Sequence, residues 1–368
     1  MQRNLERTIW IAAVAIMMLG LMALYSASSQ NVRVTQGIFY DQLMCALLGF
    51  FVMFFLSRFD YRKFSDVAYV LYIADIILLI MVLVIGRHIL GARRWIEVGD
   101  LNFQPSEVTK LILILVLSRY FSQQKSLFST RGHSPQEMLI YHVLIPFLLT
   151  LVPMLLVFKQ PDLGTAILIF GIFLTMLFIN GVRHSYILSF LGICLAMLPA
   201  MWHVLKTYQK ERLMVFLNPN MDPLGAGYTI IQSKIAVGSG GLFGRGWLAG
   251  TQNQLNFLPE RHTDFIFSVI GEEWGLFGAL LLLACYFVLI DSGLMIAQQT
   301  KDRFGFSLAA GITSILALQV IVNIGMVLGL FPVVGITLPL VSYGRSSFLT
   351  FVMMVGLLLN LNRKRTIF

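Results

Sequence analysis

The sequence predicts an all-α polytopic membrane protein with about ten transmembrane helices and a long extracytoplasmic loop between the seventh and the eighth. Two observations support this prediction. Of the 368 residues, 57% are hydrophobic and only 12% are charged, whereas a soluble globular domain is about one quarter charged. Apolar runs of roughly 18 residues or more recur along the chain, and each can cross a hydrocarbon core about 30 Å thick. We therefore expect one integral membrane domain over residues 1–368.

The apolar runs define the ten predicted spans in chain order. They cover residues 9–27, 41–57, 67–86, 105–121, 140–158, 163–180, 185–205, 264–290, 305–330 and 348–361. The first run is longer than the apolar core of a signal peptide, so we interpret it as an uncleaved span. The fifth span holds two prolines, which membrane helices tolerate. The long loop between spans seven and eight covers residues 206–263.

Basic residues predict which loops face the cytoplasm, because Lys and Arg collect in cytoplasmic loops. With the N-terminus inside, fourteen lie at the termini and in the even-to-odd loops, against six in the short odd-to-even loops. Both termini are therefore expected in the cytoplasm. The polar connections 87–107, 159–164, 206–264 and 331–347 then share the extracytoplasmic side. Topology also explains the net charge of +9, and no pattern typical of nucleic-acid binding is present.

The connection before the fourth span, "GARRWIEVGDLNFQPSEVTK", carries Arg93 and ends in a predicted helix start. Pro105 suits the first helical turn, and Glu107 lies near the positive end of the helix. Glu107 and Lys110 are three residues apart, so they share a helix face and can pair. The pair is either a structural ion pair or part of a cavity, since ionisable groups within spans tend to line cavities and pathways.

Two further connections place polar groups at the same side. In "FKQPDLGTA", Asp162 precedes the sixth span, and it could cap that helix while pointing into a shared cavity. In "PVVGITLPLVSYGRSS", two prolines and two glycines break the helix, and hydroxyl groups, Ser342 among them, collect at membrane depth. Irregular backbone is tolerated there only where it is buried or lines a wet cavity.

The long loop is rich in glycine, and we expect it to be ordered, with short amphipathic pieces such as residues 228–237. Its Gly-Ser-Gly-Gly run lacks the signature of a phosphate-binding loop, which excludes a nucleotide site of that type. The loop ends in "FLPERHTDFIF", where Asp264 opens the eighth span. A partly dry aspartate with basic neighbours, Arg261 and Lys110, is what a general base requires. The same residue could instead cap the helix.

Six segments of this chain, in order, resemble the SEDS family of bacterial cell-wall polymerases, named for shape, elongation, division and sporulation. They are "RRWIEVGDLNFQPSE", "KQPDLGT", "DPLGAGY", "QSKIAVGSGGLFGRGW", "LPERHTDFIFSVIGEEWG" and "LPLVSYG". The third favours the elongation branch, and a division or sporulation paralogue with the same chemistry is the alternative. One position departs from the family, because Arg345 stands where the family usually has a second glycine.

The resemblance implies a peptidoglycan glycosyltransferase of the bacterial cytoplasmic (inner) membrane that polymerises lipid II at its outer face. The implied catalytic residue is the aspartate of "HTD", Asp264, and the matching family positions Glu107, Lys110 and Asp162 are implied to bind substrate. We expect Asp264 to act as a general base on the acceptor hydroxyl. Ser342 is a further candidate for binding substrate. The outward cations that could neutralise the lipid pyrophosphate leaving group are Arg93, Arg94, Lys110, Lys234, Arg245 and Arg261.

Cofactor and partners follow from the same resemblance. A divalent cation, Mg²⁺ or Mn²⁺, could assist the pyrophosphate, although the sequence identifies no ligands for it. The implied partners are a class B penicillin-binding protein with transpeptidase activity, other membrane proteins of the elongation complex, and membrane lipids. Two competing functions remain: a transporter of lipid-linked precursors, which needs polar residues continuing inward through the spans, and a non-enzymatic scaffold for a transpeptidase.

Overall fold

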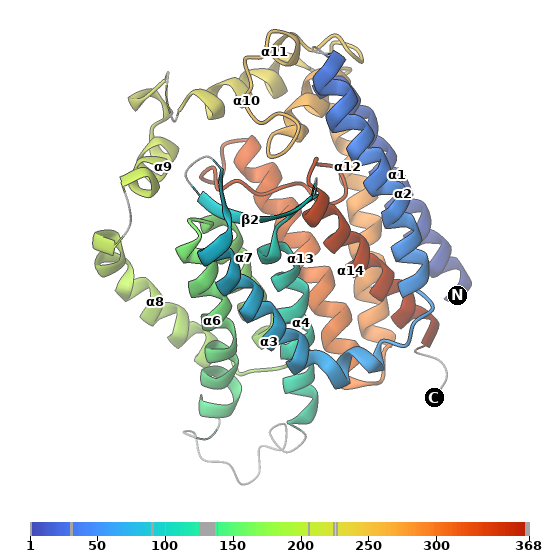
Figure 1. Cartoon of the computed structure of the whole chain (residues 1–368), viewed down its shortest axis with the longest axis vertical. Coiled ribbons are helices and arrows are strands. Elements are labelled where there is room, and N and C mark those ends of the chain that lie inside the picture. The colour runs from blue at the N-terminus through green and yellow to red at the C-terminus, as the bar shows by residue number, and fades with distance from the viewer. Residues whose placement is uncertain are drawn as a thin grey trace.

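A computed structural model describes residues 2–29, 32–89, 92–99, 101–124, 137, 139–204, 207–223, 225 and 227–364, and helices dominate it (Figure 1). The long helices are α1 (Gln2–Ser28), α2 (Val32–Leu56), α3 (Arg62–Ile85), α4 (Pro105–Gln123), α6 (Ile145–Lys159), α7 (Leu163–Ile179), α8 (His184–Val204), α12 (Ile266–Gln299), α13 (Arg303–Val327) and α14 (Arg345–Lys364). One π-helical turn, η1 (Ile140–Leu144), leads into α6.

The prediction of a helical membrane protein is confirmed. Within the described part of the chain, seven helices are long and apolar enough to cross a membrane. They are Asn4–Ser28, Gly37–Leu56, Arg62–Ile85, Ile140–Lys159, Ile266–Gln299, Arg303–Val327 and Arg345–Lys364. The three remaining predicted ranges coincide with α4, α7 and α8.

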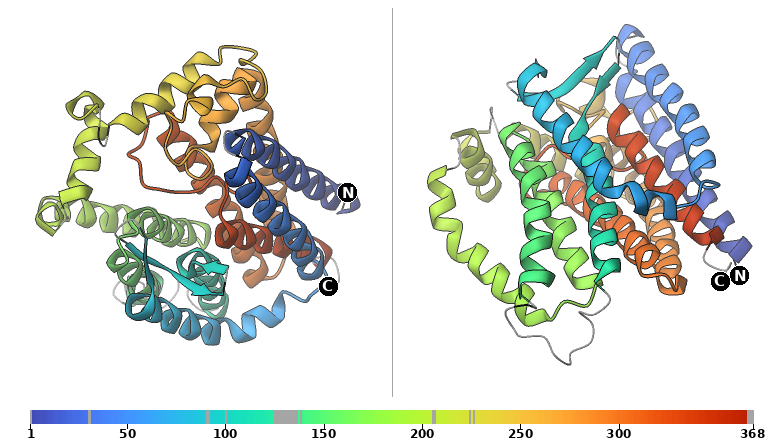
Figure 2. Two further views of the ribbon diagram at one scale, coloured as in Figure 1. Left: turned by 45° about the horizontal axis from the view of Figure 1, so that its top comes forward. Right: turned by 60° about the horizontal axis from the view of Figure 1, so that its bottom comes forward.

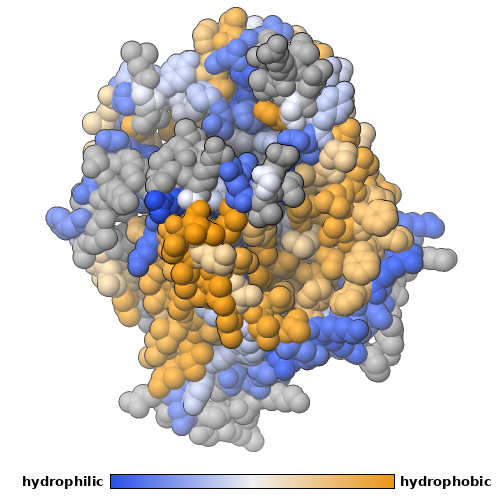
Figure 3. All heavy atoms as spheres, in the orientation of Figure 1, coloured by the Kyte–Doolittle hydropathy of each residue, from blue (hydrophilic) through white to orange (hydrophobic). Residues whose placement is uncertain are grey.

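The helices divide into a central and a peripheral set. In the apolar window of α14, 83% of the residues are buried, and in that of α13 67%, against 17% for α2 and 22% for α3. The central helices bury their apolar side chains against one another, while the peripheral ones present theirs outward. Apolar side chains form a broad band across the face in Figure 3, with hydrophilic residues above and below it. This is the surface that a bilayer requires.

The start of α1 and the end of α14 lie close together (Figure 2). The guanidinium Nε of Arg363, near the end of α14, donates a hydrogen bond of 2.9 Å to Oε1 of Glu6 in α1. The ion pair joins the first and the last long helix at one end of the bundle.

A small antiparallel sheet lies between α3 and α4, in the order β1 (Arg87–Ile89), β2 (Ala92–Val98) and β3 (Leu101–Phe103). We had expected an all-α chain, so this sheet is a correction. The sequence gives a physical reason, because "RRWIEV" contains Trp95, Ile96 and Val98, residue types that favour strands. Gly99, after β2, has a φ of +63°, which glycine adopts at little steric cost.

The long loop contains α9 (Thr207–Leu217), the 3₁₀ turn η2 (Pro219–Met221), α10 (Tyr228–Ser239) and α11 (Thr251–Gln254). The expected amphipathic piece at 228–237 is α10, which buries Ile230, Ser233 and Ala236 at helical spacing. Ser233 Oγ lies 2.9 Å from Ser268 Oγ of α12 and donates to the Val327 carbonyl at 2.7 Å. The loop is therefore anchored on the bundle.

A break in α12 receives the next part of the loop. Gly275 has φ +63° and ψ −158°, so the helix hydrogen bonds stop there. The carbonyls of Glu272 and Glu273 instead accept from the amides of Arg245 and Gly246, both at 3.0 Å. Beyond the break, the amides of Leu276 and Phe277 donate to the carbonyls of Gly241 and Leu242, at 3.0 and 3.2 Å. The backbone groups freed by the break are thus paired with loop residues.

Candidate active site

Two segments hold the backbone around Asp264, which lies just before the first turn of α12. Asn323 of α13 donates through Nδ2 to the Asp264 carbonyl at 2.9 Å and to the Ile336 carbonyl at 2.6 Å. From the irregular segment before α14, Ser342 Oγ donates to the Thr263 carbonyl at 2.5 Å. The position of Asp264 is therefore fixed by α13 and by the segment between α13 and α14.

The Asp264 carboxylate is not used by the fold. The residue preceding α12 is Phe265, which supplies no side-chain cap, so the alternative that Asp264 caps this helix is wrong. No hydrogen bond to the Asp264 carboxylate is formed by any residue that the structure describes, and the side chain is partly accessible to solvent. Its Oδ2 faces the backbone of Gly335, where an added Cβ would lie 3.4 Å away. A glycine at this point leaves room beside the carboxylate.

The surroundings of Asp264 tune it for proton transfer near neutral pH. Burial of the carboxyl group raises its pKa from 3.8 to about 7, and the nearby Glu260 carboxylate also raises it. The Arg212 guanidinium acts in the opposite direction, Asp162 raises the pKa further, and Arg94 lowers it. An acid with a pKa near 7 is partly ionised at neutral pH and still basic enough to accept a proton.

Asp162 and Arg94 lie close to each other, and their charges shift the pKa of Asp264 in opposite directions. Asp162 caps α7, because its Oδ1 accepts from the Thr165 amide at 3.2 Å. Capping was one of the two roles predicted for this residue. Its carboxylate also lies 3.8 Å from Nη1 of Arg94 in β2 and accepts from Nε2 of Gln104 at 3.2 Å. The capping residue thus joins the sheet, the start of α4 and the start of α7.

Glu107 and Lys110 form the predicted ion pair inside the bundle. Lys110 is fully buried, and its Nζ lies 2.8 Å from Glu107 Oε2 and 2.8 Å from Oε1 of Gln319. The Nζ also lies 5.1 Å from the ring centre of Phe351. Gln319 in turn donates to the Thr337 carbonyl at 2.9 Å. This network ties α4, α13 and the segment before α14 together, which is what the structural ion-pair interpretation predicts.

The other predicted cations contact separate parts of the protein. Arg93 donates to the Leu83 carbonyl at 3.2 Å, and Arg261 to the Ala27 carbonyl at 2.7 Å. Arg245 donates to Thr251 Oγ1 at 2.8 Å, and the exposed Lys234 lies against Gly329. Arg94 and Arg212 are the cations that lower the pKa of Asp264. We had expected Arg261 and Lys110 in that role.

Two residues near Asp264 were not among the predicted ones. Arg212 lies in α9 and donates to the Val333 carbonyl at 3.4 Å, but this part of the chain had been interpreted only as loop. Asn323 follows Gln319 by four residues, so both side chains share one face of α13. Two amides at this spacing in an apolar span are a signal in the sequence that could have identified Asn323.

Arg345, at the position where the family usually has glycine, turns toward α2. It forms an ion pair with Asp41, and the Tyr343 hydroxyl donates to the same carboxylate at 3.4 Å. Gln42 donates through Nε2 to the Ser342 carbonyl at 3.4 Å. The larger side chain therefore joins the segment before α14 to α2.

The residues that the structure describes contain no group of three or more His, Cys, Asp or Glu side chains placed to hold a metal ion. Magnesium bound together with substrate phosphates usually needs only one or two carboxylates. The Glu260 and Asp162 carboxylates are close enough to Asp264 to raise its pKa. These three residues are the ones that would supply the carboxylates for such an ion.

Comparison with known proteins identifies the family of this chain. A family model described as "Cell cycle protein", covering FtsW, RodA and SpoVE, matches residues 6–367. The chain belongs to the SEDS family. Peptidoglycan glycosyltransferase MrdB of Escherichia coli K12 is 41% identical over 363 residues, covering 98% of this chain and 94% of the relative. Stage V sporulation protein E of Bacillus subtilis is 38% identical over 362 residues, covering 96% and 95%.

Two solved SEDS structures have the same fold. A chain from a peptidoglycan synthase complex that coordinates polymerization and crosslinking matches with a TM-score of 0.81 and 35% identity, covering 98% of both chains. Thermus thermophilus rod shape determining protein RodA matches with a TM-score of 0.71 and 32% identity, covering 97% and 96%. The similarity thus extends over nearly the whole length of each chain.

Proposed function

We propose that this SEDS protein is a peptidoglycan glycosyltransferase that polymerises lipid II during cell elongation, with Asp264 as its general base. One observation carries the assignment of the base. Asp264 has a pKa of about 7, is partly accessible, and accepts no hydrogen bond from the described residues, although its backbone is held from two sides. Such a carboxylate is available to a substrate hydroxyl.

The chemistry needs one base. The acceptor hydroxyl attacks the anomeric carbon of the donor sugar, and the bond from that carbon to the lipid pyrophosphate breaks. The hydroxyl proton passes to the Asp264 carboxylate as the new glycosidic bond forms. Attack from the face opposite the pyrophosphate inverts the anomeric centre in a single displacement, so no second carboxylate is required as a nucleophile. The pyrophosphate leaves with the electron pair of the broken bond.

The leaving group gains negative charge, which cations stabilise. Arg94 and Arg212 are the cations whose charges act on Asp264, so they are the proposed partners of the pyrophosphate nearest the base. Arg93, Lys234, Arg245 and Arg261 are proposed to guide the anionic substrate along the outer surface. Glu107 and Lys110, which are buried and paired, are proposed to hold the frame behind the site. A bound divalent ion would supply further charge neutralisation.

The proposed topology has ten spans and both termini in the cytoplasm of the bacterial inner membrane. The Arg363–Glu6 contact supports an even number of spans, since it joins the two ends of the chain at one end of the bundle. Asn323, near the C-terminal end of α13, contacts the Asp264 carbonyl, whereas Arg62, where α3 begins, lies beside the start of α13. Asp264 and the start of α3 therefore lie at opposite ends of α13. The base is thereby proposed to face outward, where the head group of a lipid-linked sugar lies.

The proposed partners are a class B penicillin-binding protein and other membrane proteins of the elongation complex. The similarity to a chain of a complex that couples polymerization to crosslinking supports a transpeptidase partner. Release of glycan strands outside the cell would deliver them to such an enzyme.

The test is polymerisation of labelled lipid II by the purified protein together with its penicillin-binding protein. Asp264→Asn keeps the side-chain shape and removes the base, so we expect the rate to fall by about 10²–10⁴. Glu260→Gln is the matched control, because it neutralises the neighbouring carboxylate and should leave strands forming at pH 7. Synthesis of glycan strands by Asp264→Asn at the wild-type rate would refute the assignment of Asp264 as the general base. A protein that moves lipid II across vesicles without forming strands would be a transporter.

A further inference from the structure

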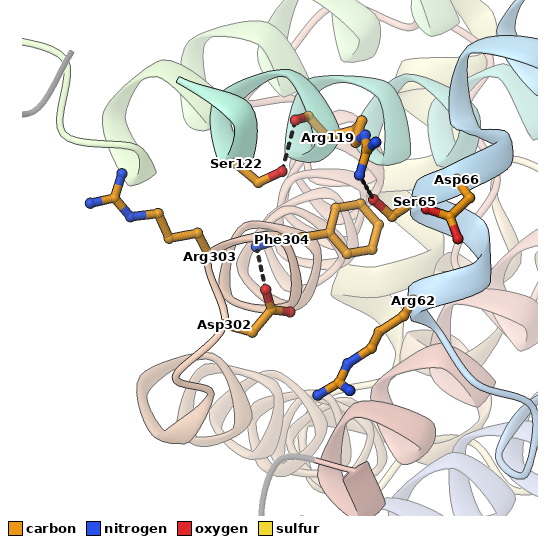
Figure 4. A pocket seen from close by; sticks show the side chains of 8 residues that line it. All are labelled: Arg62, Ser65, Asp66, Arg119, Ser122, Asp302, Arg303 and Phe304. Atoms are coloured by element: carbon orange, nitrogen blue, oxygen red, sulfur yellow. Dashed lines mark hydrogen bonds between the residues drawn. The ribbon is translucent and has the colours of Figure 1, made fainter. Parts of the chain in front are cut away.

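A polar pocket lies at the end of the bundle opposite Asp264. It encloses about 630 Å³ and is lined by Arg62, Ser65, Asp66, Arg119, Ser122, Asp302, Arg303 and Phe304. These residues come from the start of α3, the end of α4 and the start of α13. The three arginines stand on different sides of the Phe304 ring (Figure 4). The proposed catalytic site uses none of them.

The cations of this pocket outnumber its acids. Three arginines and two aspartates give a formal charge of +1. Asp302 serves the fold, because its carboxylate accepts from the amides of Phe304 and Gly305, at 3.3 and 2.8 Å, and from the Tyr61 hydroxyl at 3.0 Å. One monoanion in the pocket would bring the formal charge to zero.

Arg119 faces neutral partners. Its Nη1 donates to Ser65 Oγ at 2.8 Å, its Nε and Nη2 face the side-chain amide of Gln123, and among the described residues it makes no ion pair. Asp66 lies on the other side of Ser65 from Arg119 (Figure 4). A guanidinium and a hydroxyl side by side are donors of the kind that bind the oxygens of a phosphate group.

An apolar track continues from the pocket along α3. Asp66 lies on the exposed face of α3, and Val70, Ile73, Ile77, Ile80 and Val84 follow it at alternating steps of four and three residues, all of them exposed. This spacing keeps one face of a helix. A ligand with its charged end in the pocket would therefore have room for an apolar tail on the same face of the same helix.

We propose that this pocket binds the phosphodiester head group of an anionic glycerophospholipid, with its acyl chains along the exposed face of α3. The pocket supplies the charge for one phosphate, and the track distinguishes a lipid from a soluble phosphate. Basic pockets between membrane helices commonly bind lipid head groups in this way. In the proposed topology the lipid belongs to the cytoplasmic leaflet, but the site itself does not depend on the glycosyltransferase function.

The test is native mass spectrometry of the full-length protein after incubation with phosphatidylglycerol or phosphatidylcholine in detergent. We expect preferential retention of phosphatidylglycerol, and an apparent affinity about fivefold lower for Arg119→Ala or Arg303→Ala. Arg119→Lys keeps the charge and should stay within about twofold. Arg183→Ala is the control, because Arg183 is an exposed arginine between α7 and α8 and does not line the pocket.

Three results would overturn the proposal. Equal retention of the two lipids would remove the preference for an anion. An equal loss for Arg183→Ala would indicate general surface attraction instead of a site. Displacement of phosphatidylglycerol by inorganic phosphate at millimolar concentration would identify a site for a soluble anion. Arg303→Ala tests the pocket even if the variants of Arg119, which joins α3 to α4 through Ser65, fail to fold.

Discussion

The rate of strand synthesis should follow the ionisation of Asp264. Since its pKa is about 7 and only the carboxylate form can accept a proton, the rate should rise with pH. The ionised fraction is about 0.1 at pH 6 and about 0.9 at pH 8, so we expect roughly a tenfold increase across this range. A carboxyl group with the ordinary pKa of an aspartate would be fully ionised throughout and would give no increase.

Replacing Glu260 by Gln should move this profile in a defined direction. The Glu260 carboxylate is the second cause, after burial, of the raised pKa of Asp264. Removing its negative charge stabilises the ionised aspartate, so the midpoint of the profile should fall to a lower pH. The variant should then be faster than the wild-type protein at pH 6 and equal to it at pH 8.

The assay is the initial rate of labelled lipid II polymerisation, measured at saturating substrate and constant ionic strength from pH 5.5 to 8.5. Asp60→Asn serves as the matched control, because Asp60 lies in the α2–α3 turn and interacts locally with the Arg62 amide. A flat wild-type profile between pH 6 and 8 would contradict the assignment of the base. A midpoint that rises in Glu260→Gln, or that falls equally in Asp60→Asn, would contradict its electrostatic explanation.

Three further predictions concern stability, each measured by thermal or denaturant unfolding in detergent. Lys110→Met leaves the buried Glu107 carboxylate unpaired and should lower the free energy of unfolding by about 3–5 kcal/mol. The double variant that adds Glu107→Gln should recover most of this loss. Gly275→Ala should lower the Tm, since its Cβ would lie 2.3 Å from the Gly244 amide nitrogen, whereas Gly238→Ala, with open space around its Cβ, should not. Asp264→Asn should raise the Tm at pH 8 more than at pH 4. The unfolded carboxyl ionises near 3.8 and the folded one near 7, so wild-type stability falls as pH rises between these values and stays lower above them. An unchanged Tm difference between the two pH values would refute that reasoning.

Local patterns in the sequence predicted those parts of the site that depend on neighbouring residues. Pro105 opens α4, Asp162 caps α7, and Glu107 pairs with Lys110, as the spacing of these residues indicated. Each involves residues three or fewer apart, or the first turn of one helix. Such interactions are fixed by helix geometry and do not require the tertiary fold.

The features that sequence patterns did not predict depend on contacts between distant segments. Arg212 acts on Asp264 from a helix 52 positions earlier, and Asn323 reaches the Asp264 carbonyl from α13, 59 positions later. The break at Gly275 forms only because loop residues replace the missing helix hydrogen bonds. Gly275 lies between Gly271 and Gly278, and nothing in that spacing indicates which of the three glycines breaks the helix or what docks there. The strand β2 is different, since its aromatic and β-branched residues, Trp95, Ile96 and Val98, favour a strand and are visible in the sequence.

The docking of the loop into the break of α12 limits where this protein tolerates changes in length. The backbone pairs that join residues 241–246 to residues 272–277 depend on register. One residue inserted or deleted in either segment would mismatch every pair beyond it. Homologues should therefore keep a constant length between residues 241 and 246, and tags inserted there should prevent folding.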